Sequence, residues 1–319
     1  MEKENNFNLI SIEELLNKEI KEPRWIVKNL IPEAGIVVLS GDPGNGKTWL
    51  SLAIAQAVAS GMPLFGEFEI QQLGAVLYID EENGDYTLNP RMLKLGIQRG
   101  LPINFLIKEG VKLDKPEIIE KISGLITSNS IKLIIIDPLS QVYDGDENSA
   151  QSMAKVIGQI KTLTNLGVAV LLLHHHRKEN INNFNSNVGS KLRGSSALFA
   201  AIDSHLAITK EEDVITIKQA KSRQAKEVDP FKVELLEKEG VIKFNYLGKI
   251  KKRDSLEEKS ELLKSVLANG ELSRQQIINV LHTSYGVETI DKVLRLNVEK
   301  GNVLFRRGKS GEHFYSLLG

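Results

Sequence analysis

The chain has 319 residues, of which 41% are hydrophobic and 26% are charged, a composition typical of a globular protein with about two domains. Its 41 basic and 41 acidic residues balance, so no overall charge excess indicates a nucleic-acid or membrane partner. The lack of cysteine excludes disulfides and cysteine-ligated zinc, and no apolar run is long enough to span a membrane. The first ten residues do not form a signal peptide, so we expect a cytoplasmic protein with no membrane partner.

The N-terminal segment, 1–22, is polar and carries one helix signal. Ser11 and Glu14 form a capping-box pattern, which predicts a short helix over 12–20. The first strong strand signal follows at 36–40, an apolar and β-branched run that is typical of a buried parallel strand.

Directly after this strand, residues 41–48 read GDPGNGKT and fit the phosphate-binding loop pattern G-x-x-x-x-G-K-[ST] at every fixed position. Residues 49–59 contain apolar and small side chains without glycine or proline, which predicts a helix. Strand, glycine-rich loop and helix are the context that this pattern requires. We therefore predict that the chain binds ATP together with Mg²⁺.

The chemistry of the loop assigns roles to its residues. Backbone N–H groups around the glycines and the positive end of the helix dipole attract phosphate. Lys47 is expected to reach the β- and γ-phosphates, and the hydroxyl of Thr48 to hold Mg²⁺. The predicted nucleotide-binding residues are Gly41, Asp42, Pro43, Gly44, Asn45, Gly46, Lys47, Thr48 and Trp49.

Strand and helix signals then alternate along the chain. The predicted strands are 74–79, 103–107, 132–136 and 168–173, and the predicted helices are 88–98, 116–127 and 150–166. This rhythm predicts an α/β fold with a mostly parallel sheet and helices on both faces. Between 205 and 246, four alternating runs predict antiparallel strands that extend the sheet.

Acidic residues follow two of the predicted strands. Asp137 ends the run LIIID, and an acidic residue at the tip of a strand beside the phosphate loop is placed to support Mg²⁺. The strand at 74–79 leads directly into Asp80, Glu81 and Glu82, where a carboxylate can orient the water that attacks the γ-phosphate. A turn-opening aspartate and solvated loop carboxylates are the alternatives.

Three histidines, His174, His175 and His176, follow the predicted strand at 168–173. Adjacent residues at the end of a strand point to opposite sides, so we do not expect these side chains to converge on a metal ion. The next segment, 177–193, is rich in asparagine and contains four basic residues, which predicts a loop suited to phosphate contacts.

The basic stretch 249–253 marks a predicted domain boundary. Beyond it, at 254–319, two capped helices, a third helix and a β-ribbon follow one another in the order of a winged helix, a common DNA-binding module. Basic and acidic residues balance in this segment, so protein contacts or dimerisation are the alternative to DNA binding. The predicted domains are a helical extension at 1–22, a core at 23–248, a linker at 249–253 and the winged-helix-like domain at 254–319.

Several motifs together resemble those of one family. The phosphate-binding loop, the pattern VLYIDEE at 76–82 with Arg91 nine residues later, the string at 171–178 and the block RGSSAL at 193–198 resemble the RecA-like hexameric helicases. Among them the RepA-type plasmid replication helicases are the most similar. The resemblance covers residues 23–248 and implies a RecA-like ATPase core that assembles into a ring, a hexamer.

The resemblance also implies roles for single residues. It places the catalytic carboxylate on Glu82, with Glu81 as the rival because a shift of one residue exchanges them. A sensor of the γ-phosphate falls on His174 or His175, and a histidine run that only caps the strand is the alternative.

Lys221 and Arg223 resemble the K-x-R motif of hexameric helicases, in which both cations reach into the ATP site of the neighbouring subunit. A solvated basic strand end is the alternative. In the same family, the loop after the sensor lines the channel, which implies that 177–193 holds single-stranded DNA.

The sequence therefore predicts a helicase or translocase that hydrolyses ATP at subunit interfaces, with duplex DNA as a second partner of the tail. A non-translocating ATP switch with a DNA- or protein-binding tail is the first alternative. A small-molecule kinase is the second, and the antiparallel extension, the K-x-R motif and the tail argue against it. Whether the polymer is DNA or RNA stays open.

Overall fold

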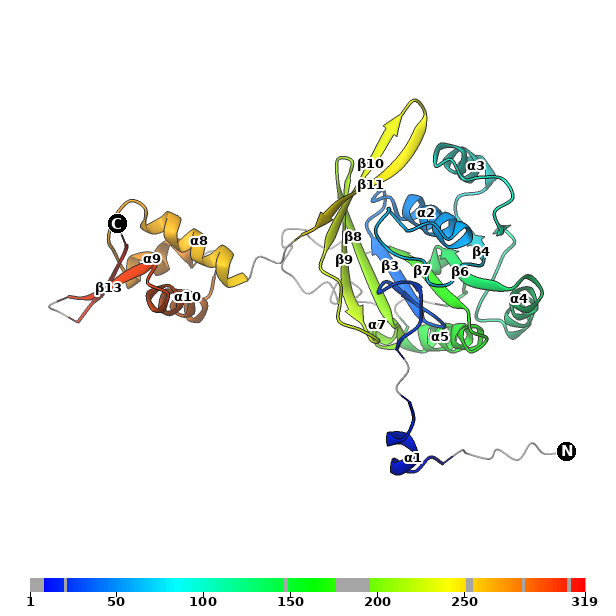
Figure 1. The fold of residues 1–319 in the computed structure, drawn as a ribbon, viewed down its shortest axis with the longest axis horizontal. Helices are drawn as coiled ribbons and strands as arrows, with labels where there is room; N and C mark the ends of the chain where they lie inside the picture. The colour runs from blue at the N-terminus through cyan, green and yellow to red at the C-terminus, as the bar shows by residue number, and fades with distance from the viewer. Residues whose placement is uncertain are drawn as a thin grey trace. The chain divides into compact units, whose positions relative to one another are not determined.

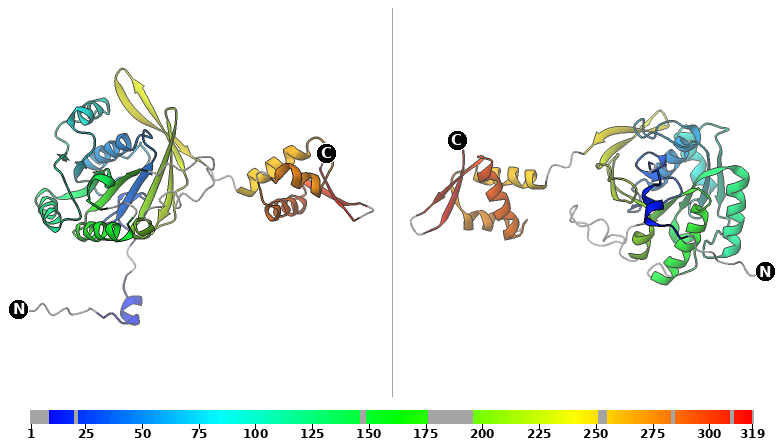
Figure 2. Two further views of the ribbon diagram at one scale, coloured as in Figure 1. Left: turned by 180° about the vertical axis from the view of Figure 1, so that it is seen from behind. Right: turned by 60° about the horizontal axis from the view of Figure 1, so that its bottom comes forward.

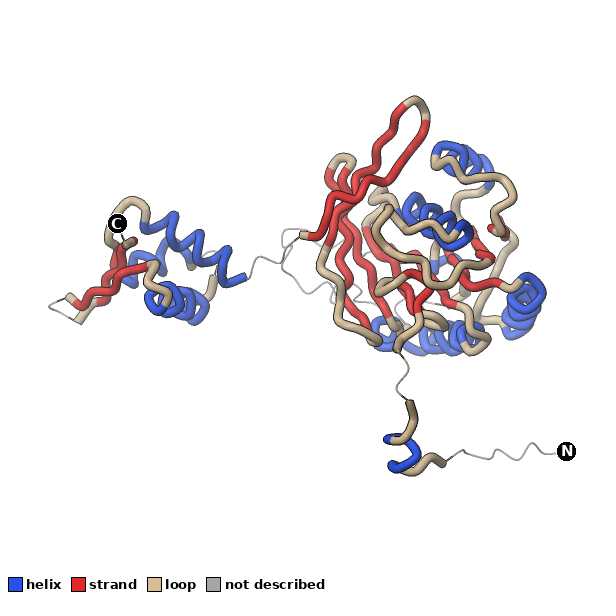
Figure 3. The backbone as a smooth tube through the Cα atoms, in the orientation of Figure 1, coloured by secondary structure: helices blue, strands red, loops and turns tan. Residues whose placement is uncertain are grey.

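A computed structural model of the chain describes residues 9–19, 22–145, 149–175, 196–250, 255–282, 285–308 and 311–318. The chain divides into two compact units, Met1–Ile250 and Lys251–Gly319, whose helices and strands are shown in Figures 1 and 3. Across these described ranges, no helix combines the length and the apolar character needed to cross a membrane.

The first unit is built on a nine-stranded sheet with the order β11-β10-β9-β8-β3-β7-β6-β4-β5. The six strands from β8 to β5 pair in parallel, and β8, β9, β10 and β11 pair antiparallel in succession. The predicted parallel sheet and its antiparallel extension are both confirmed. The strands are β3 (Ile36–Gly41), β4 (Ala75–Asp80), β5 (Ile103–Ile107), β6 (Ile131–Asp137), β7 (Ala169–His175), β8 (Ser204–Glu211), β9 (Val214–Ser222), β10 (Phe231–Lys238) and β11 (Val241–Lys249).

Helices cover both faces of this sheet, as predicted (Figures 1 and 2). One face packs against α2 and α3, and the other packs against α4, α5 and α7, so that each face has its own hydrophobic core. The helices are α2 (Lys47–Ser60), α3 (Asp85–Lys94), α4 (Pro116–Asn129), α5 (Ala150–Thr164) and α7 (Ser196–Ala201), with a short 3₁₀ turn, η1, at Leu139–Gln141.

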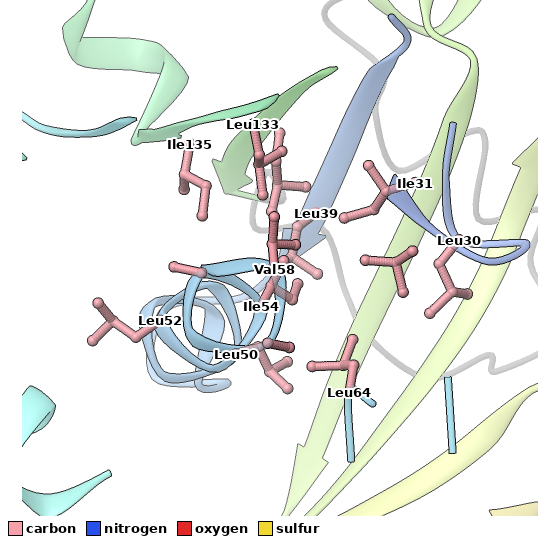
Figure 4. Packing of buried hydrophobic residues seen from close by; sticks show 14 of the residues in the cluster. Leu30, Ile31, Leu39, Leu50, Leu52, Ile54, Val58, Leu64, Leu133 and Ile135 are labelled. Atoms are coloured by element: carbon pink, nitrogen blue, oxygen red, sulfur yellow. The ribbon is translucent and has the colours of Figure 1, made fainter. Parts of the chain in front are cut away.

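Helix α2 is buried on most of its surface, which explains why its sequence shows little amphipathic pattern. Leu50, Leu52, Ile54 and Val58 are almost fully buried, and they pack with residues of the parallel strands and of the segment before β3 (Figure 4). Burying each such side chain contributes about 1.5–3 kcal/mol. The phosphate-binding loop is therefore held between two strongly anchored elements, β3 and α2.

Some element boundaries differ from the sequence prediction. Helix α1 (Ile12–Leu16) has the predicted capping box but ends earlier than expected, and it has no buried residue. Helix α3 begins at Asp85 and is followed at Gly96 by a positive φ of 63°, a conformation that glycine adopts readily at a helix end. The small antiparallel pair β1 (Trp25–Val27) and β2 (Ile31–Pro32) had no sequence signal.

Over its described residues, the second unit contains three helices and a three-stranded antiparallel sheet of order β12-β14-β13. Its core is a separate cluster that includes Leu263, Ile277, Leu294 and Tyr315. Ser273 and Gln276 form a capping box, in agreement with the capped helices predicted for this segment. The elements are α8 (Ser255–Leu267), β12 (Leu272–Ser273), α9 (Arg274–Leu281), α10 (Val287–Glu299), β13 (Val303–Arg307) and β14 (His313–Leu317).

Candidate nucleotide site

The candidate site lies where the parallel strands β3, β4, β6 and β7 end. The register pairs Gly41 with His175 and Asp80 with Asp137. The carboxyl ends of parallel strands form the edge at which open α/β sheets bind their ligands. Residues far apart in sequence are therefore brought to one edge, beside the phosphate-binding loop.

Three glycines shape the phosphate-binding loop. Gly44 and Gly46 have φ values of 85° and 87°, which side chains rarely adopt. A Cβ added to Gly41 would lie 2.6 Å from Cγ1 of Ile208, so the close approach of β8 also requires glycine there. The loop thus keeps its backbone exposed for a phosphate cradle.

Lys47 begins α2 and is 7% exposed. Its ammonium donates to the carbonyl oxygens of Gly41 (2.9 Å) and Asp42 (3.1 Å), which closes the loop on itself. Burial lowers the pKa of Lys47, and Asp137 and Glu82 offset part of that shift. The N-terminal end of α2 has no side-chain cap, so its backbone donors face the loop, as a phosphate site requires.

The predicted Mg²⁺ pair is assembled in the structure. The hydroxyl of Thr48 donates to Oδ2 of Asp137 over 2.8 Å, and the hydroxyl of Tyr78 donates to the same oxygen over 3.1 Å. Burial raises the pKa of Asp137 to about 6, the hydrogen bond from Thr48 lowers it in part, and the charge of Asp80 raises it further.

A divalent cation fits this environment. A hydroxyl and a carboxylate are oxygen donors of the kind that Mg²⁺ prefers, and the cation would offset the repulsion between buried carboxylates. Within the described ranges, no group of three or more His, Asp or Glu could hold a metal ion. Thr48 and Asp137 are the residues that would hold the cation here.

The two rival carboxylates point to different places. Asp80 is fully buried and accepts from the backbone N–H groups of Glu82 (3.0 Å) and Asn83 (2.6 Å), which fixes the turn after β4. This turn brings Oε2 of Glu82 within 3.7 Å of Nε2 of His175, inside the site. Glu81 instead accepts from the N–H groups of Gly110 (3.2 Å) and Val111 (2.8 Å) and supports a neighbouring loop.

The two histidines also diverge. His175 shares a face of β7 with Leu171 and Leu173, which pack on the α2 side, and its Nδ1 lies 3.1 Å from Nζ of Lys47. An ammonium can only donate, so Nδ1 accepts and a neutral ring carries its proton on Nε2, toward Glu82. His174 is buried and belongs to the opposite face, with Val170 and Leu172. His176 and the loop 177–193 lie outside the described residues.

Lys221 and Arg223 lie away from the phosphate loop of their own chain. Lys221 pairs with His205 at the start of β8, whereas Ser40, just before the loop, pairs with Ala207 further along it. The backbone of Arg223 bonds to Asp203, beyond the amino end of β8. Along the strands, Lys221 thus lies about 10 Å from the start of the loop and Arg223 about 17 Å.

Two further side chains, Tyr78 and Arg91, support the site, although the sequence assigned neither of them a role there. Tyr78 is fully buried, and its hydroxyl contacts both Asp137 and the hydroxyl of Ser51, the latter over 2.7 Å. Its polar hydroxyl within an otherwise apolar strand is the signal that could have identified it. The second support joins Arg91 to the turn of Glu82.

Arg91, which the helicase resemblance singled out, donates to Oδ1 of Asn83 over 3.4 Å. Its guanidinium also lies over the ring of Trp49, 5.5 Å from the centroid. Trp49, predicted among the nucleotide-binding residues, is therefore occupied by this contact at the start of α2. Arg91 connects α2 to the turn that carries Glu82.

Comparison with known proteins agrees with this architecture. A sequence model described as an AAA domain matches residues 3–180. No curated protein matches the chain. Among solved structures, one described as an ATPase domain is similar with a TM-score of 0.53 at 15% identity, over 67% of this chain and 85% of that one.

A second similar structure is a DnaB-like replicative helicase, described with its interactions with primase. The TM-score is 0.53 at 14% identity, over 72% of this chain and 66% of that one, so the chain spans just under two thirds of that relative. Identities this low establish the fold alone. The predicted RecA-like fold of the core is confirmed, and the RepA-type assignment stays a prediction.

Proposed function

This chain belongs to the AAA domain family, and from that premise we propose that it is an ATPase of the RecA-like helicase type, with ATP bound at Gly41–Thr48. The observation that carries the proposal is the convergence of Thr48, Asp137, Lys47, His175 and Glu82 at one sheet edge. These groups come from four different elements. They supply a cation that can bind phosphate, a pair of ligands for a metal ion and a carboxylate that can orient water.

Each residue has a defined task in this proposal. Lys47 exchanges the carbonyl oxygens of Gly41 and Asp42 for the β- and γ-phosphates. Thr48 and Asp137 hold Mg²⁺, which when bound offsets charge on the phosphate oxygens. Glu82 accepts a hydrogen bond from the attacking water and aligns it with the γ-phosphorus.

We assign the γ-phosphate sensor to His175. Its ring lies between Lys47, the proposed phosphate ligand, and Glu82, the proposed ligand of the attacking water. Loss of the γ-phosphate therefore changes the electrostatic surroundings of the ring on both sides. In the sequence, β7 is followed by the segment 177–193, for which we propose contact with single-stranded DNA. The proposal rests on the position of His175 and on the composition of that segment.

We further propose that the active form is a ring, a hexamer, in which Lys221 and Arg223 enter the neighbouring site. Their distance from the loop of their own chain supports a role in trans. For the second unit we propose a winged-helix-like module that contacts duplex DNA, on the basis of its order of three helices and a ribbon.

A non-translocating ATP switch is the second candidate, and one observation favours it. Two arginines of the second unit are engaged by carboxylates, Arg274 by Asp291 and Arg306 by Glu271, which reduces the charge available to phosphates. Such a unit suits a protein partner as well as DNA.

The test is to measure ATP hydrolysis with and without a single-stranded oligonucleotide, together with strand displacement. Native mass spectrometry with a non-hydrolysable ATP analogue gives the oligomeric state of the same sample. We expect a six-subunit ring and faster hydrolysis on single-stranded DNA. Hydrolysis that DNA leaves unchanged, without strand displacement, rejects the helicase and favours the switch, and a monomer with the analogue rejects the ring.

A further inference from the structure

Helix α7 holds both cations of the K-x-R motif on their own chain. Nζ of Lys221 donates to the carbonyl oxygen of Phe199 over 2.5 Å and to that of Ala200 over 3.4 Å. The guanidinium of Arg223 also donates to the carbonyl of Ala200 and lies 3.6 Å from the carboxylate of Asp203. The last carbonyls of a helix carry its negative dipole end, so this is a favourable place for two cations.

The ring of Phe199 adds a second contact. Nζ of Lys221 lies 5.0 Å from the centroid of this ring, within the range of a cation–π interaction. The ring also meets His205 edge-on, with the ring centroids 5.9 Å apart. Phe199 therefore contacts the ammonium with both its ring face and its backbone carbonyl, while its ring packs on His205 of β8.

The same contacts continue toward the ATP site. Nε2 of His205 is 2.6 Å from Oγ of Ser40, and both residues are fully buried. Ser40 directly precedes Gly41, the first residue of the phosphate-binding loop. Ser40, His205, Phe199 and Lys221 thus form one row of contacts from the loop of a chain to the cation that it would offer to its neighbour.

Holding the two cations together has an electrostatic cost. Burial lowers the pKa of Lys221, and the charge of Arg223 lowers it further, whereas Asp203 offsets part of the shift. Separating the cations relieves this repulsion. A competing anion, such as a phosphate bound to a neighbouring chain, can consequently draw the two cations away from α7.

We propose that the C-terminal end of α7, with Phe199 as the positioning residue, is a latch that retains Lys221 and Arg223 on their own chain until they enter the neighbouring ATP site. This rests on the proposed ring ATPase. In the latched state the cations face their own α7 and cannot serve a neighbour. Opening the latch makes them available, so the latch sets how readily one subunit completes the site of the next.

A mixed-subunit experiment tests this directly. A Lys47→Ala chain retains its K-x-R cations but lacks a functional ATP site, and we call it the donor. A Lys221→Met chain retains its ATP site but lacks one cation, and we call it the acceptor. Neither hydrolyses ATP efficiently alone, and titrating the donor into the acceptor restores ATPase activity at mixed interfaces.

Phe199→Leu is then introduced into either the donor or the acceptor. In the donor, it should lower the concentration needed for half-maximal ATPase activity by about two- to five-fold, the size of an exposed cation–π contact. In the acceptor, whose Lys221 is already removed, Phe199→Leu should leave this half-maximal concentration unchanged. Phe199→Tyr keeps the aromatic face and should behave like the wild type in both placements.

An equal shift in both placements, or no shift in the donor, overturns the latch, because a general effect on folding does not distinguish the two chains. Failure of the unmodified donor and acceptor to complement each other overturns the trans site itself. In that case the latch is overturned as well, but through a different arm of the experiment.

Discussion

The hydroxyl of Thr48 lies 2.8 Å from Oδ2 of Asp137, although the two residues are 89 positions apart in sequence. Thr48 belongs to the first turn of α2, and Asp137 is the last residue of β6. Their contact depends on the packing of α2 against the sheet. Because the same oxygen also accepts from Tyr78, the carboxylate has a fixed orientation before any metal binds.

Asp137→Asn should stabilise the metal-free chain at neutral pH. The pKa of Asp137 is raised to about 6 from 3.8, chiefly by burial. For an acid with a raised folded-state pKa, the stability contribution is complete below pH 3.8 and is lost progressively as the pH rises to 6. A shift of about two pKa units corresponds to about 3 kcal/mol, which Asn avoids because it carries no charge.

The measurement is urea unfolding with a chelator, near pH 4 and near pH 7. The advantage of Asp137→Asn over the wild type should be small at the lower pH and approach about 3 kcal/mol at the higher. Asp144→Asn is the matched control, because Lys112 lowers the pKa of this exposed carboxyl and its removal should not stabilise. An Asp137→Asn chain less stable than the wild type near pH 7 contradicts the prediction.

Glu82→Gln should lower the turnover number for ATP by about 100- to 10,000-fold while leaving nucleotide affinity nearly unchanged. The amide retains the size of the side chain but is a poor acceptor for the proton of the attacking water. Stopped-flow or steady-state kinetics with an independent binding measurement separate the two parameters.

Glu81→Gln is the control for that experiment. Its oxygens serve the N–H groups of Gly110 and Val111, so its loss should cost about 1 kcal/mol of stability with turnover close to that of the wild type. The reverse pattern, with turnover lost at Glu81 and kept at Glu82, exchanges the two roles.

Local sequence signals predicted the phosphate-binding loop and the strands because each depends on neighbouring residues. The strand register, once predicted, also brings Asp137 beside the loop. The resemblance favoured Glu82 over Glu81, but the different directions of the two side chains could not be predicted, because they depend on the turn that buried Asp80 fixes. The face of β7 on which His175 lies could have been predicted, since His175 shares the alternation of Leu171 and Leu173.

The positions of Lys221 and Arg223 illustrate a different limit. The K-x-R motif could be recognised in the sequence. Its contacts with α7 could not be predicted, because they arise from the return of β9 alongside β8. No helix or strand was predicted for the block at 193–198, and α7 begins within it at Ser196. Long-range packing of this kind leaves no periodic pattern in the sequence.

Tyr78→Phe should weaken the site through Asp137. The hydroxyl of Tyr78 is shared between Ser51 and Asp137 in a fully buried setting, so its removal leaves polar partners unsatisfied and costs about 1–3 kcal/mol of stability. The Mg²⁺ concentration for half-maximal ATPase activity should rise about 10-fold or more, as expected for a group that orients a metal ligand.

Tyr246→Phe is the comparison. The hydroxyl of Tyr246 is buried without a hydrogen-bond partner among the residues that the structure describes, so its removal should be neutral or slightly stabilising. Thermal unfolding of both variants and a Mg²⁺ titration check the pair. Equal losses of stability in the two variants contradict the assigned role of Tyr78.

Arg295→Ala and Arg274→Ala should separate DNA contact from stability in the second unit. Arg295 is exposed on α10, and its charge acts on Asp291 without a direct ion pair among the described residues, so its guanidinium donors are available to a phosphate. Arg274 forms a two-bonded pair with Asp291, at 2.8 and 2.7 Å. If the unit binds duplex DNA, Arg295→Ala should reduce the slope of log affinity against log salt by about one.

Arg274→Ala should instead cost about 1 kcal/mol of stability and leave the salt slope unchanged, because its charge is already engaged by a carboxylate. Affinities for a duplex at several salt concentrations, with unfolding of the full chain, provide both quantities. The two arginines flank Asp291 on one surface, so they differ mainly in their partner. An affinity for duplex DNA that neither variant nor salt alters rejects electrostatic DNA binding by this unit and favours a protein partner.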